Sequence, residues 1–386
     1  MPYGNVRPSL SRAGLAAGVA LLMLAPAGPA AAAAPARVGS VQKAMEELAR
    51  TPGVVGVVGG AYVDGRSVGL GSAGSRLLDG EGGKIPPNSR FRIWSQTKQM
   101  VATVVLQLVE EGELGVDDKL GDVLPVVVEK DLVQRADEVT VRQLLRHTSG
   151  IPDWYADKPN PDGSEGDPAF DVFDFTTPYR PLDLVAWSRG RPRTGEPGEK
   201  WSYSNTNYTL LGLIIERLTG HDLATELRTR LFGPLKMTRT YLMAQPPDGV
   251  RGPHGHGYYP DADGTPRDVD RFNASLTGAP GGAVSTTHDV SAFNRAFTQG
   301  KLLPPELQRV LTDRLPSAPR SRGEGRGRCG DDLYITGGAA PGSIAMTFYS
   351  EDGRRQFAMS FTLSVQPSAV EVDAGKAVES VFCPSP

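Results

Sequence analysis

The order of strand-like and helix-like segments along this chain constrains its fold most strongly. Near the start, Val54 to Val63 is an apolar, β-branched run, and the two-residue hairpin signal Asp64-Gly65 leads from it into Arg66 to Gly71. Near the other end, three further strand patterns lie at Leu333 to Thr336, Ser343 to Tyr349 and Gln356 to Leu363. A sheet is therefore expected to draw its strands from both ends of the chain.

Helical patterns fill the sequence between these strands. Lys98 to Glu111 and Asn205 to Leu218 carry apolar residues at helical spacing. Two more helices are expected at the ends, at Val38 to Ala49 and at Ala369 to Phe382. We predict an α+β fold, an α/β sandwich in which helices flank an antiparallel sheet and a mostly helical lobe is inserted between its strands.

The predicted domain organisation follows from this pattern. Residues 1–36 are predicted to be a signal peptide, and residues 37–386 a single domain. Within that domain, the helical lobe at roughly 100–290 is inserted between sheet segments 50–95 and 330–365.

The first 36 residues have the pattern of a secretory signal. Arg7 and Arg12 give a positive start, Ala13 to Ala25 is an apolar run, and Ala30 to Ala36 offers small residues for cleavage. The alternative is a membrane anchor, but the apolar run is shorter than the roughly 20 residues that span a bilayer. We therefore predict a secreted, extracellular protein without a membrane span.

The charge balance bears on the class of partner. The 386 residues include 41 basic and 44 acidic side chains, which is close to neutral. Proteins that bind nucleic acid or a membrane surface usually carry a strong basic excess. A small-molecule substrate is therefore expected, and no nucleic acid.

A possible nucleophile lies where the long helix at 98–111 begins. Ser95-Gln96-Thr97-Lys98 is a Ser-x-x-Lys pattern, which puts Ser95 and Lys98 on the same side of a helical turn. Acyl transfer needs a hydroxyl with a base beside it, and a buried lysine is able to serve as that base. The pattern alone is weak, because Ser40-Val41-Gln42-Lys43 also matches and serine often only caps a helix.

A second pattern, Tyr203-Ser204-Asn205, lies on the turn before the helix at 205–218. A tyrosine beside a lysine is able to relay a proton to the leaving group, and an asparagine amide is able to bind a substrate carbonyl and the lysine. The alternative is an ordinary buried tyrosine followed by a capping asparagine. Tyr3-Gly4-Asn5 matches the pattern by chance.

A third pattern, Thr336-Gly337-Gly338-Ala339, continues the strand that starts at Leu333. Adjacent glycines allow a substrate to approach a strand edge closely. A main-chain N–H on this strand would complete an oxyanion hole with the N–H of Ser95. The alternative is a glycine-rich bulge without function.

Together, these three patterns resemble the serine β-lactamase and penicillin-binding protein superfamily, in particular its class C-like branch. The resemblance covers nearly the whole mature chain and is closest to secreted D-alanyl-D-alanine carboxypeptidases. Its segments are Phe91 to Lys98, Leu144 to Pro152, Pro197-Gly198 with Tyr203 to Tyr208, Pro234 to Met237, and Gly281 to Thr286.

The resemblance implies a role for each site residue. Ser95 would be the acylated nucleophile, Lys98 its base and Tyr203 the acid and base for the leaving group. Asn205 would bind the substrate amide, and the N–H groups of Ser95 and Ala339 would form the oxyanion hole, with Thr336, Gly337 and Gly338 on the same substrate-binding strand.

The resemblance also implies a substrate and an inhibitor. The substrate would be a peptidoglycan stem peptide or another small acyl donor, a β-lactam would be a covalent inhibitor, and no cofactor is expected. The alternatives are an esterase, amidase or β-lactamase of the same superfamily, or a catalytically weak penicillin-binding-like protein.

One position departs from the family pattern. The third motif of the family usually begins with His or Lys, whereas this chain has Thr336. The missing cation normally helps to bind a substrate carboxylate, so its absence favours the esterase and the weak-activity alternatives. Arg326 or Arg328, in the preceding loop, would replace the cation, unless that loop is only solvated surface.

The two cysteines, Cys329 and Cys383, are predicted to form a disulfide because secreted chains with few, paired cysteines usually do. The alternative is two free thiols. The bond would be worth roughly 4 kcal/mol by loop-closure entropy.

The histidines are interpreted as structural. His254 and His256 form a His-x-His pair without a recognisable third ligand, so they are taken as surface residues and no metal site is predicted. His147 is expected to brace its loop by hydrogen bonds.

Overall fold

The computed structural model describes residues 38–155, 168–246, 249–313, 333–370 and 373–383. They belong to a unit that comprises residues 37–386. The predicted signal peptide, Cys329, and the arginines of the loop at 316–330 lie outside the described residues. Among the residues that are described, no helix combines the length and the apolar character needed to cross a bilayer.

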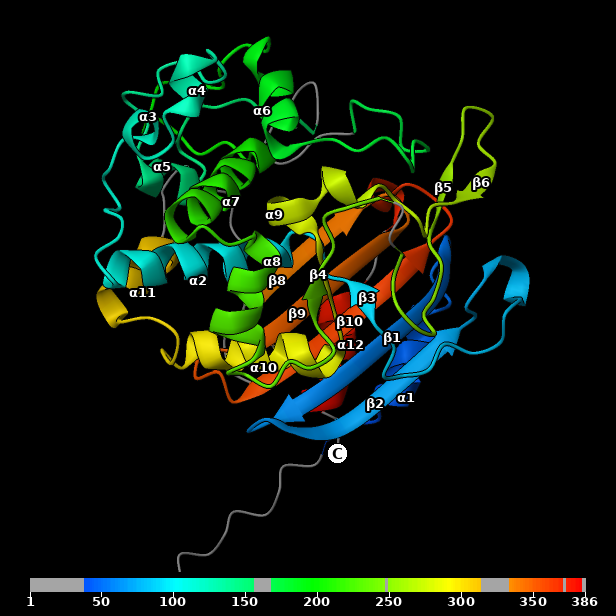
Figure 1. Cartoon of the computed structure of the whole chain (residues 1–386). Coiled ribbons are helices and arrows are strands. Elements are labelled where there is room, and N and C mark those ends of the chain that lie inside the picture. Colours follow the sequence, from blue (N-terminus) through cyan, green and yellow to red (C-terminus); the bar gives the residue numbers. More distant parts are fainter. Residues whose placement is uncertain (1–37, 156–167, 247–248, 314–332, 371–372, 384–386) are drawn as a thin grey trace, which may run out of the picture. The chain divides into compact units, whose positions relative to one another are not determined.

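A five-stranded antiparallel sheet is the centre of the fold (Figure 1). Its strand order is β2-β1-β10-β9-β8, so the pairing of β1 with β10 joins the first two strands of the chain to the last three. The turn at Asp64-Gly65 has φ of 52° and 77°, as a tight hairpin requires. The predicted α+β fold is therefore confirmed. The strands are β1 (Val54–Val63), β2 (Arg66–Gly74), β8 (Leu333–Ala340), β9 (Ser343–Ser350) and β10 (Arg355–Leu363).

Helices cover both faces of this sheet. The terminal helices α1 (Val41–Leu48) and α12 (Ala374–Phe382) lie behind it in Figure 1 and form an apolar core with it. On the other face, α10 (Thr287–Thr298) and α2 (Gln96–Glu110) pack against the strands. Apolar residues occur on several sides of α2, and most of the helix is buried. It forms the centre of the larger core.

The inserted lobe consists mainly of short helices around α7 (Asn205–Thr219), and its largest core runs from α2 through α7. A turn with π-helical hydrogen bonds, at Arg228–Phe232, follows α8 (Leu223–Leu227). The lobe contains α3 (Leu120–Val123), α4 (Val126–Glu129), α5 (Val141–Leu145), α6 (Pro181–Arg189), α7 (Asn205–Thr219), α8 (Leu223–Leu227) and α9 (Gly278–Gly281), and α11 (Pro305–Thr312) packs against it. Short 3-10 turns lie at Leu78–Gly80, Ala274–Leu276 and Pro367–Ala369.

Two small sheets were not predicted from the sequence. One joins β3 (Phe91–Arg92), β7 (Ala283–Ser285) and β4 (Tyr241–Leu242) in the order β3-β7-β4. The other is a hairpin of β5 (Tyr258–Pro260) and β6 (Pro266–Asp268). The first small sheet matters for the site, because β3 leads directly to Ser95.

Several predicted element bounds were wrong, most clearly those of β8 and α12. Strand β8 continues past Thr336 to Ala340, because residues 333–340 pair with β9 along their whole length, glycines included. Helix α12 begins at Ala374, after a cap by Asp373, rather than at Ala369. Cys383 lies at the end of α12. Its predicted partner lies outside the described residues, so the disulfide stays a prediction, which non-reducing peptide mapping would test.

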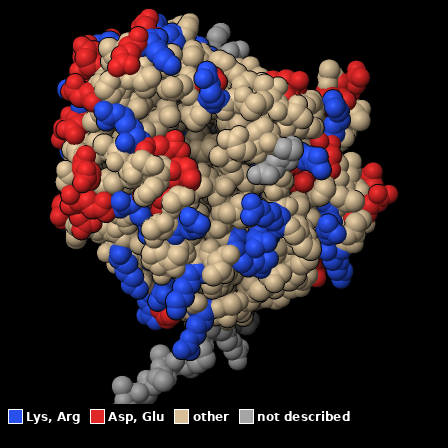
Figure 2. Space-filling model, viewed as in Figure 1, with Lys and Arg blue, Asp and Glu red and all other residues tan. Residues whose placement is uncertain are grey.

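Charged side chains of both signs lie on the face drawn in Figure 2, and neither sign covers it. This pattern agrees with the formal net charge of −3.

Candidate active site

Ser95 lies at the junction between β3 and α2, on a turn of unusual backbone conformation. The residue before it, Trp94, has a φ of 49°, which a bulky residue rarely adopts. The Trp94 indole donates a hydrogen bond of 2.9 Å to the Ser343 hydroxyl on β9. Ser95 is the N-cap residue of α2, but its hydroxyl makes no capping bond. The hydroxyl is therefore available to other side chains.

Two side chains approach the Ser95 hydroxyl. Its Oγ lies 2.7 Å from the Tyr203 hydroxyl oxygen and 3.0 Å from Lys98 Nζ. Ser95 and Lys98 are neighbours on one helical turn, whereas Tyr203 arrives from the loop before α7. The fold thus brings together the three residues for which catalytic roles were predicted.

Lys98 is held in place by fixed acceptors. The residue is only 5% exposed, and Nζ donates hydrogen bonds of 2.7 Å to Asn205 Oδ1 and of 2.7 Å to the Pro280 carbonyl in α9. With two N–H groups used in this way, the remaining position of Nζ faces Ser95. Pro280 was not singled out in the sequence, because a main-chain carbonyl leaves no mark on residue type.

His147 supports Tyr203 from the loop that follows α5. Its ring stacks on the Tyr203 ring at 4.6 Å between centroids. Its Nδ1 accepts a hydrogen bond of 3.2 Å from the Ser204 N–H, which confirms the predicted bracing role. Burial, with a smaller effect of nearby Lys98, lowers the pKa of His147 to about 3. The imidazole is therefore neutral at physiological pH.

Asp153 is a site residue that sequence analysis missed. Its Oδ1 accepts from the Asn205 N–H at 3.1 Å, and its Oδ2 accepts from Asn205 Nδ2 at 3.0 Å. Because Nδ2 is bound to Asp153, Asn205 Oδ1 points to Lys98. Burial raises the pKa of Asp153 to about 6, although hydrogen bonds from Tyr155 and Asn205, and the charge of Lys98, act in the opposite direction.

The third predicted motif runs beside the nucleophile. Gly338 on β8 packs against the Ser95 segment so closely that a Cβ there would collide with Ser95 N and Trp94 Cβ. Ala339 lines the same cavity as Ser95. Thr336 lies three residues earlier, opposite Thr347 on β9, and Gly337 lies between it and Gly338.

The cavity over Ser95 is largely apolar. Its polar groups include Ser95 itself and Asn205, and aromatic rings come from three separate parts of the chain. It is lined by Trp94, Ser95, Trp154, Tyr155, Asn205, Phe272, Leu276, Thr277, Pro280, Gly281, Ala339 and Ala340. A hydroxyl with two proton-carrying neighbours at the edge of an apolar cavity is suited to nucleophilic acyl transfer.

Comparison with known proteins supports this interpretation. Residues 41–376 match the Beta-lactamase protein family. The chain is 32% identical over 230 residues to penicillin-binding protein 4* of Bacillus subtilis, a match that covers 56% of this chain and 46% of that protein. It is 31% identical over 271 residues to penicillin-binding protein 4 of Amycolatopsis lactamdurans, covering 70% of this chain and 66% of that protein. The chain thus spans only about half to two thirds of these relatives.

Solved structures resemble the fold over most of its length. A D-stereospecific amidohydrolase from Streptomyces sp. superposes with a TM-score of 0.74 at 29% identity, covering 90% of this chain and 98% of that one. A D-amino acid amidase from Ochrobactrum anthropi shares the fold, with a TM-score of 0.67 at 24% identity over 83% of this chain and 89% of that one. The resemblance to the superfamily is confirmed: the chain belongs to the Beta-lactamase family, whose members include serine hydrolases of the penicillin-binding type.

Proposed function

We propose that the protein is a serine hydrolase that forms an acyl-enzyme on Ser95. The observation that carries this proposal is the position of Ser95 Oγ, 2.7 Å from the Tyr203 hydroxyl and 3.0 Å from Lys98 Nζ. Both distances are within reach of direct proton transfer.

Lys98 is proposed as the base of the acylation step. Asn205 Oδ1 and the Pro280 carbonyl occupy two N–H groups of Nζ, so the lone pair of a neutral amine would point to Ser95 Oγ. Ser95 Oγ attacks the substrate carbonyl carbon and its proton passes to Lys98. Tyr203 then delivers a proton to the leaving amine or alcohol as the scissile bond breaks. Water then attacks the ester and gives a proton to the Tyr203 oxygen, the acid leaves, and the proton held by Lys98 returns to Ser95 Oγ.

The developing oxyanion is proposed to bind between the main-chain N–H groups of Ser95 and Ala339. Ser95 lies at the start of α2, where N–H groups lack helical partners and the helix dipole is positive. The close approach of Gly338 to Ser95 brings β8 within reach of the same oxygen. Donors fixed in this way stabilise the transition state more than the ground state.

For the substrate we propose an amide or ester of a D-amino acid derivative with an apolar side chain. Thr336 supplies a neutral hydroxyl where a substrate carboxylate would need a cation. The aromatic walls from Trp154, Tyr155 and Phe272 favour an apolar group. Support also comes from the likeness to the D-stereospecific amidohydrolase. The D-alanyl-D-alanine carboxypeptidase activity predicted from the sequence is the second candidate, and the penicillin-binding names of the relatives favour it.

A matched substrate pair separates the two candidates. An N-acyl-D-alanine amide and an N-acyl-D-alanyl-D-alanine present the same acyl part with a neutral or a charged leaving group. We expect faster release from the amide, and none from its L-isomer. Turnover of the dipeptide alone would establish the carboxypeptidase instead. Failure of both substrates, together with no labelling by a fluorescent penicillin or a fluorophosphonate, would make the protein a silent binding protein.

We also propose that the protein is secreted. The proposal rests on the signal pattern of residues 1–36. N-terminal sequencing of protein collected from the culture medium tests it, and a start near residue 37 is expected. Retention of residues 1–36 in a cell-bound protein would contradict it.

A further inference from the structure

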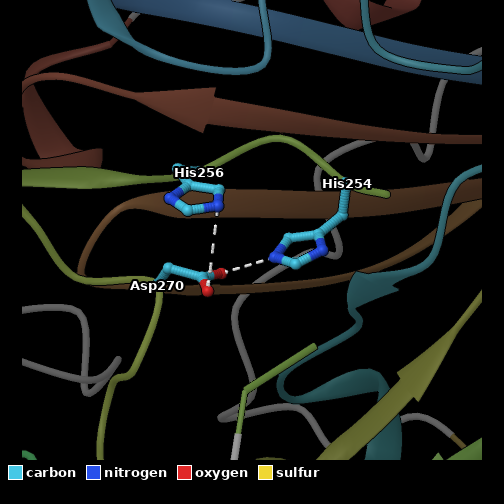
Figure 3. A group of neighbouring side chains, drawn as sticks. All are labelled: His254, His256 and Asp270. Carbon is cyan, nitrogen blue, oxygen red and sulfur yellow. Dashed lines mark hydrogen bonds and ion pairs between the residues drawn. The ribbon is translucent and has the colours of Figure 1, made fainter. Parts of the chain in front are cut away.

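His254, His256 and Asp270 form a cluster (Figure 3), and none of them lines the cavity over Ser95. One ligand atom from each lies within 4.8 Å of the others. The histidines precede β5 and Asp270 follows β6, so pairing of the two strands brings them together. The sequence lacked a recognisable third ligand for the His-x-His pair, because Asp270 becomes a neighbour only through this hairpin.

Both imidazole rings turn the same nitrogen toward Asp270. His254 Nε2 lies 2.8 Å from Asp270 Oδ1, and His256 Nε2 lies 4.0 Å from Asp270 Oδ2. The rings stack at 5.2 Å between centroids with an interplanar angle of 15°. Figure 3 shows both rings converging on the carboxylate.

The opposite nitrogens are engaged by oxygen acceptors. His254 Nδ1 lies 2.5 Å from the Gly252 carbonyl, and His256 Nδ1 lies 2.7 Å from Asp268 Oδ2. Because both partners are acceptors, we assign the hydrogen of each of these bonds to Nδ1. In a neutral ring the lone pair is then on Nε2, which faces Asp270. Metal-binding histidines are usually oriented by outer oxygens of this kind.

The two arginines beside the cluster donate to main-chain carbonyls, so the Asp270 carboxylate oxygens remain directed to the two histidines. The buried Arg92 guanidinium donates to the Asp270 main-chain carbonyl at 2.6 Å, and Arg76 Nε donates to the His254 carbonyl at 3.2 Å. Two acidic side chains, Asp268 and Asp270, offset these two arginines. The side chain of His256 is 24% exposed, so an ion from solvent has a path to the site.

We propose that His254 Nε2, His256 Nε2 and the Asp270 carboxylate bind a zinc ion, with water as a fourth ligand. Imidazole and carboxylate ligands in this number suit Zn²⁺. Tetrahedral zinc ligands lie about 3.3 Å apart for metal–ligand bonds of about 2.0 Å, and the observed distances of 2.8 and 4.0 Å lie on either side of this value.

The proposed ion has a structural role. It ties the segment before β5 to the segment after β6, and Arg92 connects Asp270 to β3, which leads to Ser95. The ion would thus hold the outer support of the nucleophile segment without touching the reacting atoms. A ligand that binds the folded state alone raises its stability by mass action.

The test is zinc titration of the untagged mature chain after treatment with a chelator. We expect one equivalent of Zn²⁺ to bind, measured by calorimetry, and the unfolding midpoint to rise by several degrees. His256→Gln and Asp270→Asn should each weaken binding at least tenfold. His288→Gln is the matched control, because His288 is also beside an aspartate, Asp289, but is 61% exposed and outside the cluster. Its zinc affinity should equal that of the unchanged protein.

A second measurement needs no variant. Co²⁺ in a site with imidazole ligands should give visible absorption bands that disappear when Zn²⁺ is added. Absence of saturable binding, or equal zinc affinity in the unchanged protein, His256→Gln and Asp270→Asn, would overturn the proposal. The three residues would then be a hydrogen-bonded ion pair that only braces the hairpin.

Discussion

The chain contains the Ser-x-x-Lys pattern at the start of two helices, and the two copies have different surroundings. At α1, the Ser40 hydroxyl accepts the Lys43 N–H at 3.2 Å and caps the helix, while the Lys43 side chain is exposed. At α2, the Ser95 hydroxyl caps nothing and contacts Lys98 and Tyr203. The same four-residue pattern therefore caps a helix at α1 and forms part of a reactive cluster at α2.

The difference comes from segments that are distant in sequence. Asn205, Pro280 and Tyr203 surround Lys98 and Ser95, and each belongs to the inserted lobe. Helix α1 packs its apolar side on the sheet and on α12, so its Ser and Lys face solvent. Reactivity is therefore expected at Ser95 alone, and paired substitutions at the two copies measure this.

Replacing the two lysines should give the largest contrast. Lys98→Met removes the proposed base and should slow acylation about a thousandfold, as loss of general base catalysis does. Lys43→Met should leave the rate unchanged. Stopped-flow labelling with a fluorescent penicillin or an activated ester measures both rates, with melting curves to verify folding. Equal rates in the two variants would remove the distinction between the copies.

Tyr203→Phe should have the next largest effect. It deletes the hydroxyl that lies 2.7 Å from Ser95 Oγ and should slow acylation by roughly a hundredfold. The stacking ring remains, so His147 should keep its place. Tyr208→Phe is the control, because its hydroxyl bonds to the Leu145 carbonyl instead. A loss in Tyr208→Phe equal to that in Tyr203→Phe would mean that the effect is structural.

Asp153→Asn should lower the acylation rate, because Asp153 orients Asn205. The new amide presents an N–H where Asn205 Nδ2 now donates to a carboxylate oxygen, so Asn205 loses its fixed orientation. Loss of one hydrogen bond to a charged group is worth about 1.5 kcal/mol, which corresponds to a rate about tenfold lower. Measured acylation rates that match those of the unchanged protein would show that Asp153 does not orient Asn205.

The same variant tests the pH dependence of stability. Burial raises the pKa of Asp153 to about 6, whereas the unfolded chain should have the ordinary value of about 3.9. Between these values the folded state binds a proton that the unfolded state lacks. Asp153 therefore makes the free energy of unfolding decrease as the pH rises through 6, by about 1–3 kcal/mol. Urea unfolding at pH 4.5 and 7 should show this decrease less strongly in Asp153→Asn, and an unchanged decrease would contradict the assignment.

The smallest effect is expected from Ser40→Ala. Loss of the helix cap should lower the free energy of unfolding by about 1 kcal/mol, without any change in labelling. Urea unfolding and labelling of the same sample measure both quantities. Reduced labelling in a stably folded Ser40→Ala protein would mean that the α1 copy takes part in the reaction.

Much of the main sheet could be predicted because its strands are long apolar runs bounded by turn residues, as in β1 and β10. Strands of two or three residues, such as β4 and β7, carry too little pattern to be recognised. Helices α2 and α7 could be predicted because their apolar residues recur at helical spacing, and these residues form much of the large core.

Ser95, Lys98 and Tyr203 could be named from short motifs whose order along the chain agreed with the expected elements. The roles of Asp153 and Pro280 depend on contacts with distant residues, and their types are ordinary for a loop. The same holds for Asp270, whose relation to His254 exists only in the folded hairpin. Contacts of this kind are a property of the tertiary structure, so local patterns do not indicate them.

Mapping of the covalent adduct tests the central claim most directly. Trypsin should release each copy of the motif on its own six-residue peptide, residues 93–98 for Ser95 and residues 38–43 for Ser40. After labelling with a fluorescent penicillin or a fluorophosphonate, mass spectrometry should find the added mass on the peptide of residues 93–98, at Ser95. Ser95→Ala should lose the adduct while its unfolding midpoint stays nearly the same. An adduct on residues 38–43 or on any other serine, or labelling that persists in Ser95→Ala, would contradict the account.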